Sequence, residues 1–452
     1  TNYSDTVDVD VHFLESGPYY FKNRESNKYM SVQEHSQADG AQIVQESFKG
    51  EIWQEFYLER DFTTGYIRIK NRNSNKYLGV ENNSSAHDTD IKQYAYSKNS
   101  AGQQFKIERI SGGETIKIIP RTGEGLSPQR VVCVANYAIN SDGVHIQQRD
   151  FGANDGYYRD EWYAYKFDRS SDFGKLVVNM QKLYELAQEY SELQHSLNPD
   201  APEINPTELT MQYIRRLAYN SDYDDGLNKW YYAAGPICQP FVNYVYTENP
   251  ALCNYFNHDK EWEITDFDNQ EFEINHLAAT YNVLLYNSIV PAIYEDEVDD
   301  LGGWGGDLRS SVPVIMRDVN YSDDYNTVYN ATYNYIGTGG NFNMPDLLAD
   351  VDAYNLYKMT KPDSPAARFF EYYYEGGYLK RFTDFIGNKS YANIYNRCER
   401  MITMVPLEWF WAIKKVDENG NDTNEDLILT DTQIEAICDA YTTYIIDQTA
   451  NE

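Results

Sequence analysis

Three stretches in the second half of the chain contain side chains that could do chemistry. In FEINHLAATYN, His276 follows Glu273 by one helical turn, and apolar residues cover two faces of the expected helix. A buried histidine beside a carboxylate can act as a general base with its orienting group. The alternative is a hydrogen-bonded core histidine, and the HExxH pattern of zinc proteases is absent.

The second stretch is LGGWGGDL, Leu301 to Leu308, in which four glycines surround Trp304. Glycine allows positive φ and close approach of the backbone to a ligand. Trp304 could then stack on a sugar, with Asp307 as an acceptor or acid. The alternative is a tight turn in which Trp304 fills the core and Asp307 caps the next helix.

The third stretch, MPDLLADVDAYN, places Asp346 and Asp350 one helical turn apart, with Asp352 on another face. Paired carboxylates could share hydrolysis or bind Ca²⁺ through their oxygens. Acids in a first turn also complement the helix dipole, which is our interpretation of Asp346. The candidate catalytic residues are His276, Asp307 and Asp350.

Helices are expected to position these side chains, because the apolar period becomes about 3.6 residues after residue 170. The segment from Leu176 to Tyr190 is apolar along one face, and two capping patterns begin at Asn205 and Thr430. Residues 171–452 are therefore predicted to form a mainly α-helical domain. Its other predicted helices are 271–289, 345–359, 366–386 and 391–415.

One acidic hexapeptide, Asp417 to Asp422, begins like a calcium-binding loop. Position six is Asp422 where such loops have glycine, and position twelve is Ile428 where they have glutamate. A solvated β-turn is predicted here. Ca²⁺ is the one cofactor that the sequence leaves open, and no metal site is predicted.

The first third of the chain contains a repeat. Lys22 to Val32 reads KNRESNKYMSV and Lys70 to Val80 reads KNRNSNKYLGV, identical at eight of eleven positions. Each unit continues as short strands with polar turns, and a degraded third copy runs from Thr115 to Tyr165. Short strands at close spacing predict an all-β fold, and three such units can share one core. Residues 1–170 are therefore predicted to form a β-trefoil.

The repeated order is an aromatic strand, N-R-x-S-x-K-Y/C-L-x-V, D-G-x-x-I/V-x-Q and a closing Q-x-W/F. It resembles the ricin-B type lectin module over about residues 12–168. The resemblance implies binding of galactose, xylan or other glycans at one shallow site per repeat, as an anchor for a partner domain. Sugar-binding members carry Asp between the Leu and the Val of the second motif. This chain has Ser31, Gly79 and Cys133 there.

The candidate carbohydrate-binding residues are the polar groups on the adjacent hairpins. They are Glu34, His35, Gln42 and Gln45 in the first repeat, Glu81, His87, Asp90 and Gln93 in the second, and Asp142, His145 and Gln147 in the third. For Gln45, Gln93 and Gln147 the alternative is that they brace turns inside the trefoil. Trp304 is a further carbohydrate-binding candidate in the helical domain.

Composition restricts the partners. The formal charge of -32, from 70 acidic and 38 basic residues, argues against nucleic acid and anionic membranes as ligands. No apolar run reaches about 18 residues, so no transmembrane segment is predicted. The 42 tyrosines suit stacking on sugars. Of five scattered cysteines, at most Cys238 and Cys253 are expected to form a local bridge.

The chain starts at Thr1 without an initiator Met, which fits a processed secreted protein or a trimmed one. The three helical stretches resemble segments of uncharacterised secreted proteins of Gram-positive bacteria, which implies no activity. We expect a secreted bacterial lectin-like protein whose trefoil anchors a helical effector domain to a glycan or cell surface. The alternatives are an extracellular glycan or peptidoglycan hydrolase with the trefoil as its binding module, and a toxin or adhesin component.

Overall fold

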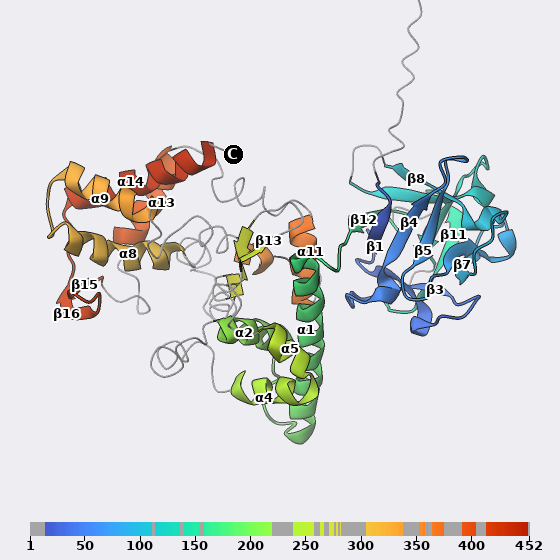
Figure 1. Ribbon diagram of the computed structural model, residues 1–452, viewed down its shortest axis with the longest axis horizontal. Helices are drawn as coiled ribbons and strands as arrows, with labels where there is room; N and C mark the ends of the chain where they lie inside the picture. Colours follow the sequence, from blue (N-terminus) through green and yellow to red (C-terminus); the bar gives the residue numbers. More distant parts are fainter. Residues whose placement is uncertain are drawn as a thin grey trace, which may run out of the picture. The chain divides into compact units, whose positions relative to one another are not determined.

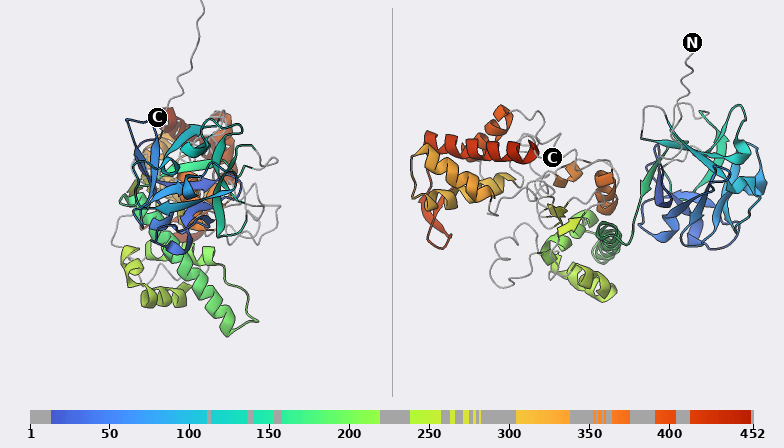
Figure 2. Two further views of the ribbon diagram at one scale, coloured as in Figure 1. Left: turned by 90° about the vertical axis from the view of Figure 1, so that its right-hand side faces the viewer. Right: turned by 45° about the horizontal axis from the view of Figure 1, so that its top comes forward.

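The computed structural model of the chain (Figures 1 and 2) forms two units, Thr1–Gln181 and Lys182–Glu452, and each is described by itself. The described residues are 14–110, 114–135, 140–152, 158–218, 238–256, 263–265, 271–274, 277–278, 281, 304–337, 352–353, 355–357, 359, 364–374, 391–403 and 413–450.

The first unit contains a closed barrel and a cap of hairpins. Its strands are β1 (Gly17–Asn23), β2 (Tyr29–Val32), β3 (Ile43–Glu46), β4 (Phe56–Arg60), β5 (Ile67–Asn71), β6 (Tyr77–Val80), β7 (Thr89–Tyr94), β8 (Phe105–Arg109), β9 (Ile116–Pro120), β10 (Arg130–Val134), β11 (Val144–Asp150) and β12 (Trp162–Lys166). The barrel closes through antiparallel pairs in the order β1, β4, β5, β8, β9, β12 and back to β1. The hairpins β2–β3, β6–β7 and β10–β11 meet where β11 pairs with both β3 and β7. This is the predicted β-trefoil.

The repeated polar turn is built around one asparagine per copy. Asn23 Oδ1 accepts from the amides of Glu25 and Ser26 at 3.2 and 3.1 Å, and its Nδ2 donates to Arg159 O at 2.9 Å. Asn71 repeats this pattern within its own turn and toward Trp53 O, at 2.9 Å. The motif recurs because each turn must close on itself and bind the segment that leads into the neighbouring barrel strand.

The residue after that asparagine ties neighbouring repeats together. Arg24 pairs with Glu161, and Arg72 pairs with the fully buried Glu55. In the degraded third copy, Arg121 donates to the side-chain amide oxygen of Gln104 at 2.5 Å. The third junction therefore keeps the geometry but replaces the ion pair by a charge-assisted hydrogen bond.

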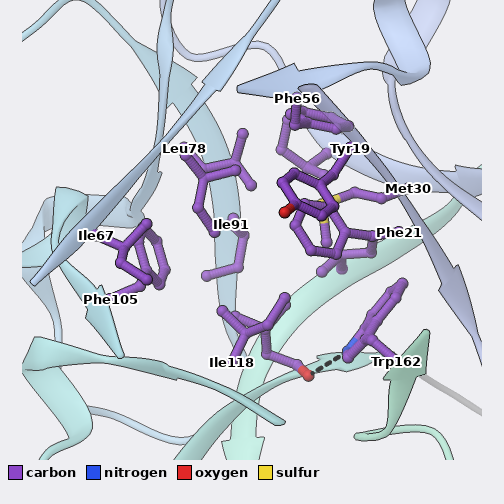
Figure 3. Packing of buried hydrophobic residues seen from close by; sticks show 14 of the residues in the cluster. Tyr19, Phe21, Met30, Phe56, Ile67, Leu78, Ile91, Phe105, Ile118 and Trp162 are labelled. Atoms are coloured by element: carbon purple, nitrogen blue, oxygen red, sulfur yellow. Dashed lines mark hydrogen bonds between the residues drawn. The ribbon is translucent and has the colours of Figure 1, made fainter. Parts of the chain in front are cut away.

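The trefoil core repeats three times around the barrel (Figure 3). Phe56, Phe105 and Trp162 come from the closing motif of each repeat, and all three are fully buried. Trp162 Nε1 donates to Val132 O at 2.9 Å, so its one polar group is satisfied inside the core. Equivalent apolar positions supply the rest of the cluster, which explains why one repeat could not bury its apolar face alone.

Gln42 holds the three hairpins together at their meeting point. Its side chain is 7% exposed, and its Nε2 lies 2.9, 3.0 and 3.4 Å from the carbonyl oxygens of Ile43, Ile91 and Ile146, one from each hairpin. The carbonyls of three strands converge here and need a donor, which the amide provides.

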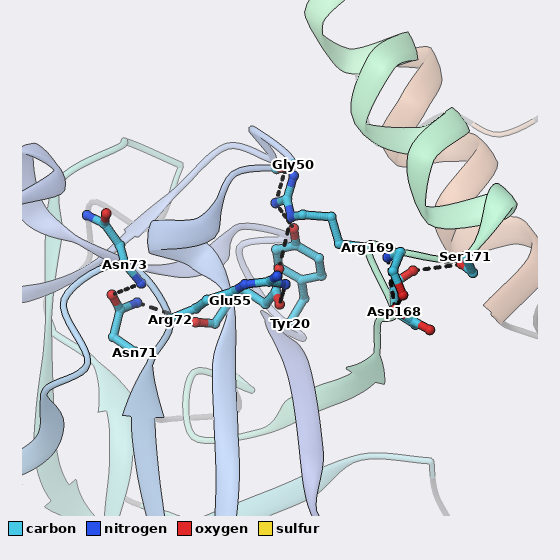
Figure 4. Close-up of polar contacts among 10 residues, drawn as sticks. Tyr20, Gly50, Glu55, Asn71, Arg72, Asn73, Asp168, Arg169 and Ser171 are labelled. Atoms are coloured by element: carbon cyan, nitrogen blue, oxygen red, sulfur yellow. Dashed lines mark hydrogen bonds and ion pairs between the residues drawn. The ribbon is translucent and has the colours of Figure 1, made fainter. Parts of the chain in front are cut away.

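The segment after β12 is fixed to the trefoil by polar contacts (Figure 4). Arg169 pairs with Glu55 at 3.2 Å and donates to Gly50 O and to Tyr20 Oη. Ser171 Oγ then accepts from the Gly174 amide at 3.0 Å, which caps helix α1 (Asp172–Leu197). The change from β to α structure therefore falls beside residue 170.

The second unit is mainly helical, as predicted. Beyond α1 its elements are α2 (Pro206–Ala218), α4 (Cys238–Glu248), α5 (Pro250–Tyr255), β13 (Glu263–Thr265), β14 (Glu271–Glu273), α8 (Trp304–Asp318), α9 (Tyr325–Gly337), α11 (Pro365–Tyr374), α13 (Tyr391–Thr403), β15 (Lys414–Val416), β16 (Asp422–Asp426) and α14 (Asp431–Ala450). Aromatic contacts join α1, α2, α4 and α5, and a separate apolar cluster joins α8, α9, α13 and α14.

Both predicted helix caps are confirmed. Asn205 Oδ1 accepts from the amides of Thr207 and Glu208 at 2.9 and 3.4 Å. Thr430 and Gln433 exchange reciprocal side-chain to amide hydrogen bonds at 3.3 and 2.9 Å, which is a capping box.

Three local predictions were wrong. Residues 271–273 form β14, paired with β13, and Lys414–Val416 forms β15, because strand pairing overrides the local helical pattern. The loop or turn expected around Trp304 is the start of α8, whose buried Val312 and Met316 offset the low helix propensity of the glycines.

The predicted turn at Asp417 is present in the β15–β16 hairpin, where Asp417 Oδ1 accepts from the Asn421 amide at 2.9 Å.

The predicted Cys238–Cys253 bridge is also wrong. Cys253 is a free thiol whose Sγ lies 3.0 Å from Tyr213 Oη. Cys133, Cys398 and Cys438 are buried thiols, and burial raises the pKa of Cys438.

Replacing Gln42 by Leu should destabilise the trefoil, because it leaves buried carbonyl oxygens without their donor. We expect the free energy of unfolding to fall by about 2 kcal/mol. The matched control is Gln37→Leu on an exposed turn, for which we expect less than about 0.5 kcal/mol. Urea unfolding followed by circular dichroism measures both, and equal effects of the two variants would contradict the bracing role.

Candidate functional site

One strand of the second repeat presents an aromatic ring and two charged groups on a single face. Asp90, Lys92 and Tyr94 alternate along β7 with the buried Ile91 and Gln93, so their side chains share the outer face. Asp90 and Lys92 are each 21% exposed. We call these residues, with Glu81, His145 and Gln147, the β7 face.

Glu81 completes the charged part of the β7 face. It lies on the turn after β6 and forms an ion pair with Lys92. The hydrogen bond with Glu81 raises the pKa of Lys92. Burial, followed by the charge of Glu81, raises the pKa of the Tyr94 phenol. The ammonium group therefore stays charged and the phenol stays neutral at physiological pH, so the face offers both donors and acceptors.

The third repeat contributes two side chains to the β7 face. Strands β7 and β11 pair with Gln147 opposite Asp90. Gln147 Nε2 donates to Asp90 Oδ1 at 2.7 Å, and His145 Nδ1 lies 3.4 Å from the same oxygen. His145 is 46% exposed, so its ring borders solvent. Four predicted residues, Glu81, Asp90, His145 and Gln147, are thus brought together.

A further polar cluster adjoins this junction. Arg149 Nε pairs with Asp88 at 2.8 Å, and His87 lies 3.3 Å from both Asp88 and Asp150. The Asp150 amide also donates to His87 Nδ1 at 3.2 Å, which fixes that nitrogen as an acceptor. His87 therefore ties the second repeat to the third and is largely occupied by protein contacts.

The position where sugar-binding relatives carry Asp is closed in this repeat. A side-chain carbon on Gly79 would lie 3.1 Å from Tyr94 Cδ2 and 3.2 Å from Gln103 Cγ. The Tyr94 ring therefore lies over the space of the absent carboxylate. Glu81 and Asp90 are the carboxylates that remain on this face.

The first repeat offers a smaller aromatic feature. His35 is exposed and stacks on Trp53, with ring centroids 3.7 Å apart and an interplanar angle of 25°. Glu34 is exposed on the same turn, while Ser31 is fully buried and donates to Glu46. The stacked imidazole covers one face of the Trp53 indole.

Three glutamines brace turns. For Gln45 and Gln93 this is the alternative interpretation given in the sequence analysis. Gln93 Nε2 donates to Ser36 O and Ala38 O at 2.7 and 3.0 Å, and Gln45 Nε2 donates to Ser141 O at 3.0 Å. In the third repeat this position belongs to Gln148, which the sequence analysis missed, and not to Gln147. A shift of one residue along a strand moves the side chain to the opposite face.

Asp142 connects the third repeat to the first. It accepts from Lys28 Nζ and, at 2.9 Å, from the Ser47 amide. Asp39 does the same for the next pair of repeats, through Lys76 and the Ala95 amide at 2.8 Å. The hydrogen bond from Lys76 lowers the pKa of Asp39. Burial acts to raise the pKa of Asp142, but its contacts with Lys28 and Ser47 outweigh burial and hold it below its usual value.

Within its described part, the structure does not bring together the candidate catalytic and sugar-binding residues of the helical domain. His276 and Asp350 lie outside the described residues, and Trp304 and Asp307 belong to the first turn of α8. Asp352 is described and fully buried, and it accepts from the phenols of Tyr372 and Tyr373 at 2.7 and 2.5 Å. The catalytic assignments therefore stay predictions.

Metal and membrane features can be stated only for the described part of the chain. There, no group of three or more His, Cys, Asp or Glu side chains is arranged to hold a metal ion. None of the described helices is long and apolar enough to cross a bilayer. Calcium binding stays a prediction.

Comparison with known proteins agrees with the trefoil geometry. The model of the ricin-type β-trefoil lectin domain-like family matches residues 11–94 and 52–149. The N-terminal domain is thus similar to ricin-type β-trefoil lectin domains. The rest of the chain lies outside that match.

Two solved structures illustrate the likeness of the ricin-type domain. The designed 3-fold symmetric protein ThreeFoil is 28% identical, covering 33% of this chain and 99% of that one with a TM-score of 0.30. An exo-β-1,3-galactanase from Clostridium thermocellum is 28% identical, covering 34% of this chain and 30% of that one with a TM-score of 0.30. Scores this low carry no information about function.

The helical part matches proteins of unknown activity. Residues 278–452 match the family model described as YkzU uncharacterised protein. The uncharacterized protein YkzU of Bacillus subtilis (strain 168) is 32% identical over 117 residues, covering 25% of this chain and 63% of the relative. The chain thus spans just under two thirds of that relative. The predicted resemblance to uncharacterised Gram-positive proteins is confirmed, and it assigns no activity.

Lys92 and Tyr94 are the site residues that sequence reasoning missed. Strand alternation could have found them, because both follow Asp90 by even steps along the same strand. No local sequence pattern indicated that β11 contributes His145 and Gln147 to the β7 face.

Lowering the pH should loosen the junctions held by Asp39 and Asp142. Both carboxyls have depressed pKa values in the folded state, so their stabilisation is present above about pH 4 and is lost as the pH falls through the folded pKa. We expect the Tm to decrease between pH 5 and pH 2.5, and the double variant Asp39→Asn and Asp142→Asn to show a smaller decrease. Glu34→Gln, an exposed residue, serves as the control. An unchanged pH dependence in the double variant would refute the assignment.

Proposed function

We propose that the trefoil binds a neutral glycan through the β7 face and anchors the helical domain to a glycan surface outside the cell. The observation that supports this most is the arrangement of Tyr94 with Glu81, Lys92 and Asp90 on the β7 face. The ricin-type lectin domain makes carbohydrate the expected class of ligand.

The chemistry of the face suits a pyranose ring. The apolar face of a sugar can pack on the Tyr94 ring, while its hydroxyl groups need both acceptors and donors. Carboxylate oxygens of Glu81 and Asp90 accept, and the Lys92 ammonium and the Gln147 amide donate. Because positive and negative groups alternate here, a neutral sugar is favoured over a strongly anionic one.

The proposal also includes an anchoring role for the trefoil, secretion of the protein and a role as a toxin or adhesin component. The net charge of -32 disfavours nucleic acid and anionic membrane partners, which leaves neutral polymers at a surface as suitable targets. The hydrolase alternative depends on His276, Asp307 and Asp350, and no described side chain favours it over a binding role.

Replacing Tyr94 by Ala should abolish most glycan binding, because it removes the stacking surface without touching the trefoil core. A glycan array with the full chain identifies the ligand, and calorimetry then compares the variants. We expect Tyr94→Ala to weaken binding about tenfold, roughly 1.4 kcal/mol. Asp90→Asn should weaken it to a similar extent.

The matched control is Tyr158→Ala, which removes an exposed tyrosine of the same domain that lies under the Arg24 guanidinium. We expect unchanged affinity for this variant. If both tyrosine variants bound the glycan as tightly as the original chain, the β7 face would not be the site. If no glycan on the array bound at all, the proposed function itself would be refuted.

A further inference from the structure

The helical domain carries rows of tyrosines that converge on acidic side chains. Tyr325, Tyr329 and Tyr333 stack along α9 with centroids 5.9 and 6.2 Å apart, and Tyr391 stacks on Tyr395 of α13 at 6.2 Å. Helix α14 packs against both α9 and α13. The two rows therefore flank one helix.

The carboxylate of Asp439 on α14 joins the two rows. Its Oδ2 accepts from Tyr325 Oη at 2.5 Å and its Oδ1 accepts from Tyr391 Oη. Tyr391 is 43% exposed, so the junction borders solvent. Glu435, one turn earlier on α14, and Glu399, one turn after Tyr395 on α13, are both exposed. We call Tyr325, Tyr391, Tyr395, Asp439 and Glu435 the Asp439 cluster.

Two carboxylates of the trefoil that accept from a tyrosine also pair with a lysine. Glu124 accepts from Tyr66 and also pairs with Lys106, whose ammonium lies 5.4 Å from the centre of the Tyr66 ring. Glu59 accepts from Tyr77 at 2.8 Å and pairs with Lys70, whose ammonium lies 5.8 Å from that ring. In both cases a cation bridges the carboxylate and the face of its tyrosine.

No such cation is found at the Asp439 cluster among the side chains that the structure describes. Among the described residues, no Lys or Arg pairs with Asp439 or Glu435, and none lies over the rings of Tyr325, Tyr391 or Tyr395. The acidic groups also follow one another at a spacing of one helical turn, where like charges repel. Burial, with the charges of Glu399, Asp439 and Glu435, raises the pKa of Tyr395 to about 12.

We propose that the Asp439 cluster binds an arginine or lysine side chain from a basic segment of another polypeptide. A guanidinium or ammonium group supplies the missing partner, because it pairs with the carboxylate and lies over the tyrosine rings as Lys106 and Lys70 do. A neutral sugar would leave the repulsion between the acidic groups in place. The net charge of -32 would further speed the approach of a basic partner.

Binding of a labelled hexa-arginine peptide to the full chain tests this proposal by fluorescence anisotropy. Asp439→Asn should weaken binding about tenfold or more, and Glu435→Gln about threefold. Glu418→Gln in the β15–β16 turn changes the net charge equally but lies away from the tyrosines, so less than about a twofold change is expected. Tyr391→Leu should weaken binding about threefold, and Tyr391→Phe should weaken it less.

Several outcomes would overturn the proposal. Equal losses for Asp439→Asn and Glu418→Gln would mean that the peptide responds only to the overall charge. Loss of glycan binding in Asp439→Asn with unchanged peptide affinity would assign the cluster to sugars. Glu435→Gln keeps the test valid if Asp439→Asn unfolds, because the Glu435 side chain makes no hydrogen bond among the described residues. None of these results depends on the β7 face.

Discussion

Closure of the trefoil depends on polar contacts that pass from each repeat to the next. The asparagine turns bind the segments that lead into neighbouring strands, and Arg24 and Arg72 pair with acids of a neighbouring repeat. Gln42 donates to one carbonyl oxygen from each hairpin. Apart from the exposed Arg24, these groups are buried or half-buried, where an unmet hydrogen bond is expensive. The three repeats therefore fit together in one register, and the apolar core follows from that register.

Closure also decides which polar groups remain available to a ligand. Most candidate sugar-binding residues of the hairpins are engaged in holding repeats together, including Gln45, Gln93 and Asp142. The β7 face differs because its charged side chains project outward from a strand whose alternate residues, Ile91 and Gln93, are buried. A trefoil with three similar repeats thus presents three dissimilar surfaces, since each junction uses its polar groups differently.

Two tyrosine–carboxylate pairs of the trefoil are completed by a lysine. There the cation comes from the neighbouring strand, as for Lys70 opposite Tyr77 in the β5–β6 pair. In the helical domain the tyrosines lie on α9 and α13 and the carboxylate on α14, with no described basic residue facing them. Helix packing brings these three faces together, and a chain of this acidity has few cations to place among them.

The sequence by itself determined the trefoil, its three copies and the helix caps at Asn205 and Thr430, because these depend on local turn chemistry and on a fixed repeat. It did not determine which of Gln147 and Gln148 faces inward, since a strand's register is set by its partner. Only the tertiary structure placed His145 and Gln147 beside Asp90, more than 50 positions away, by pairing β11 with β7. Long-range strand pairing leaves no local signal in the chain, so the site had to be found in the folded molecule.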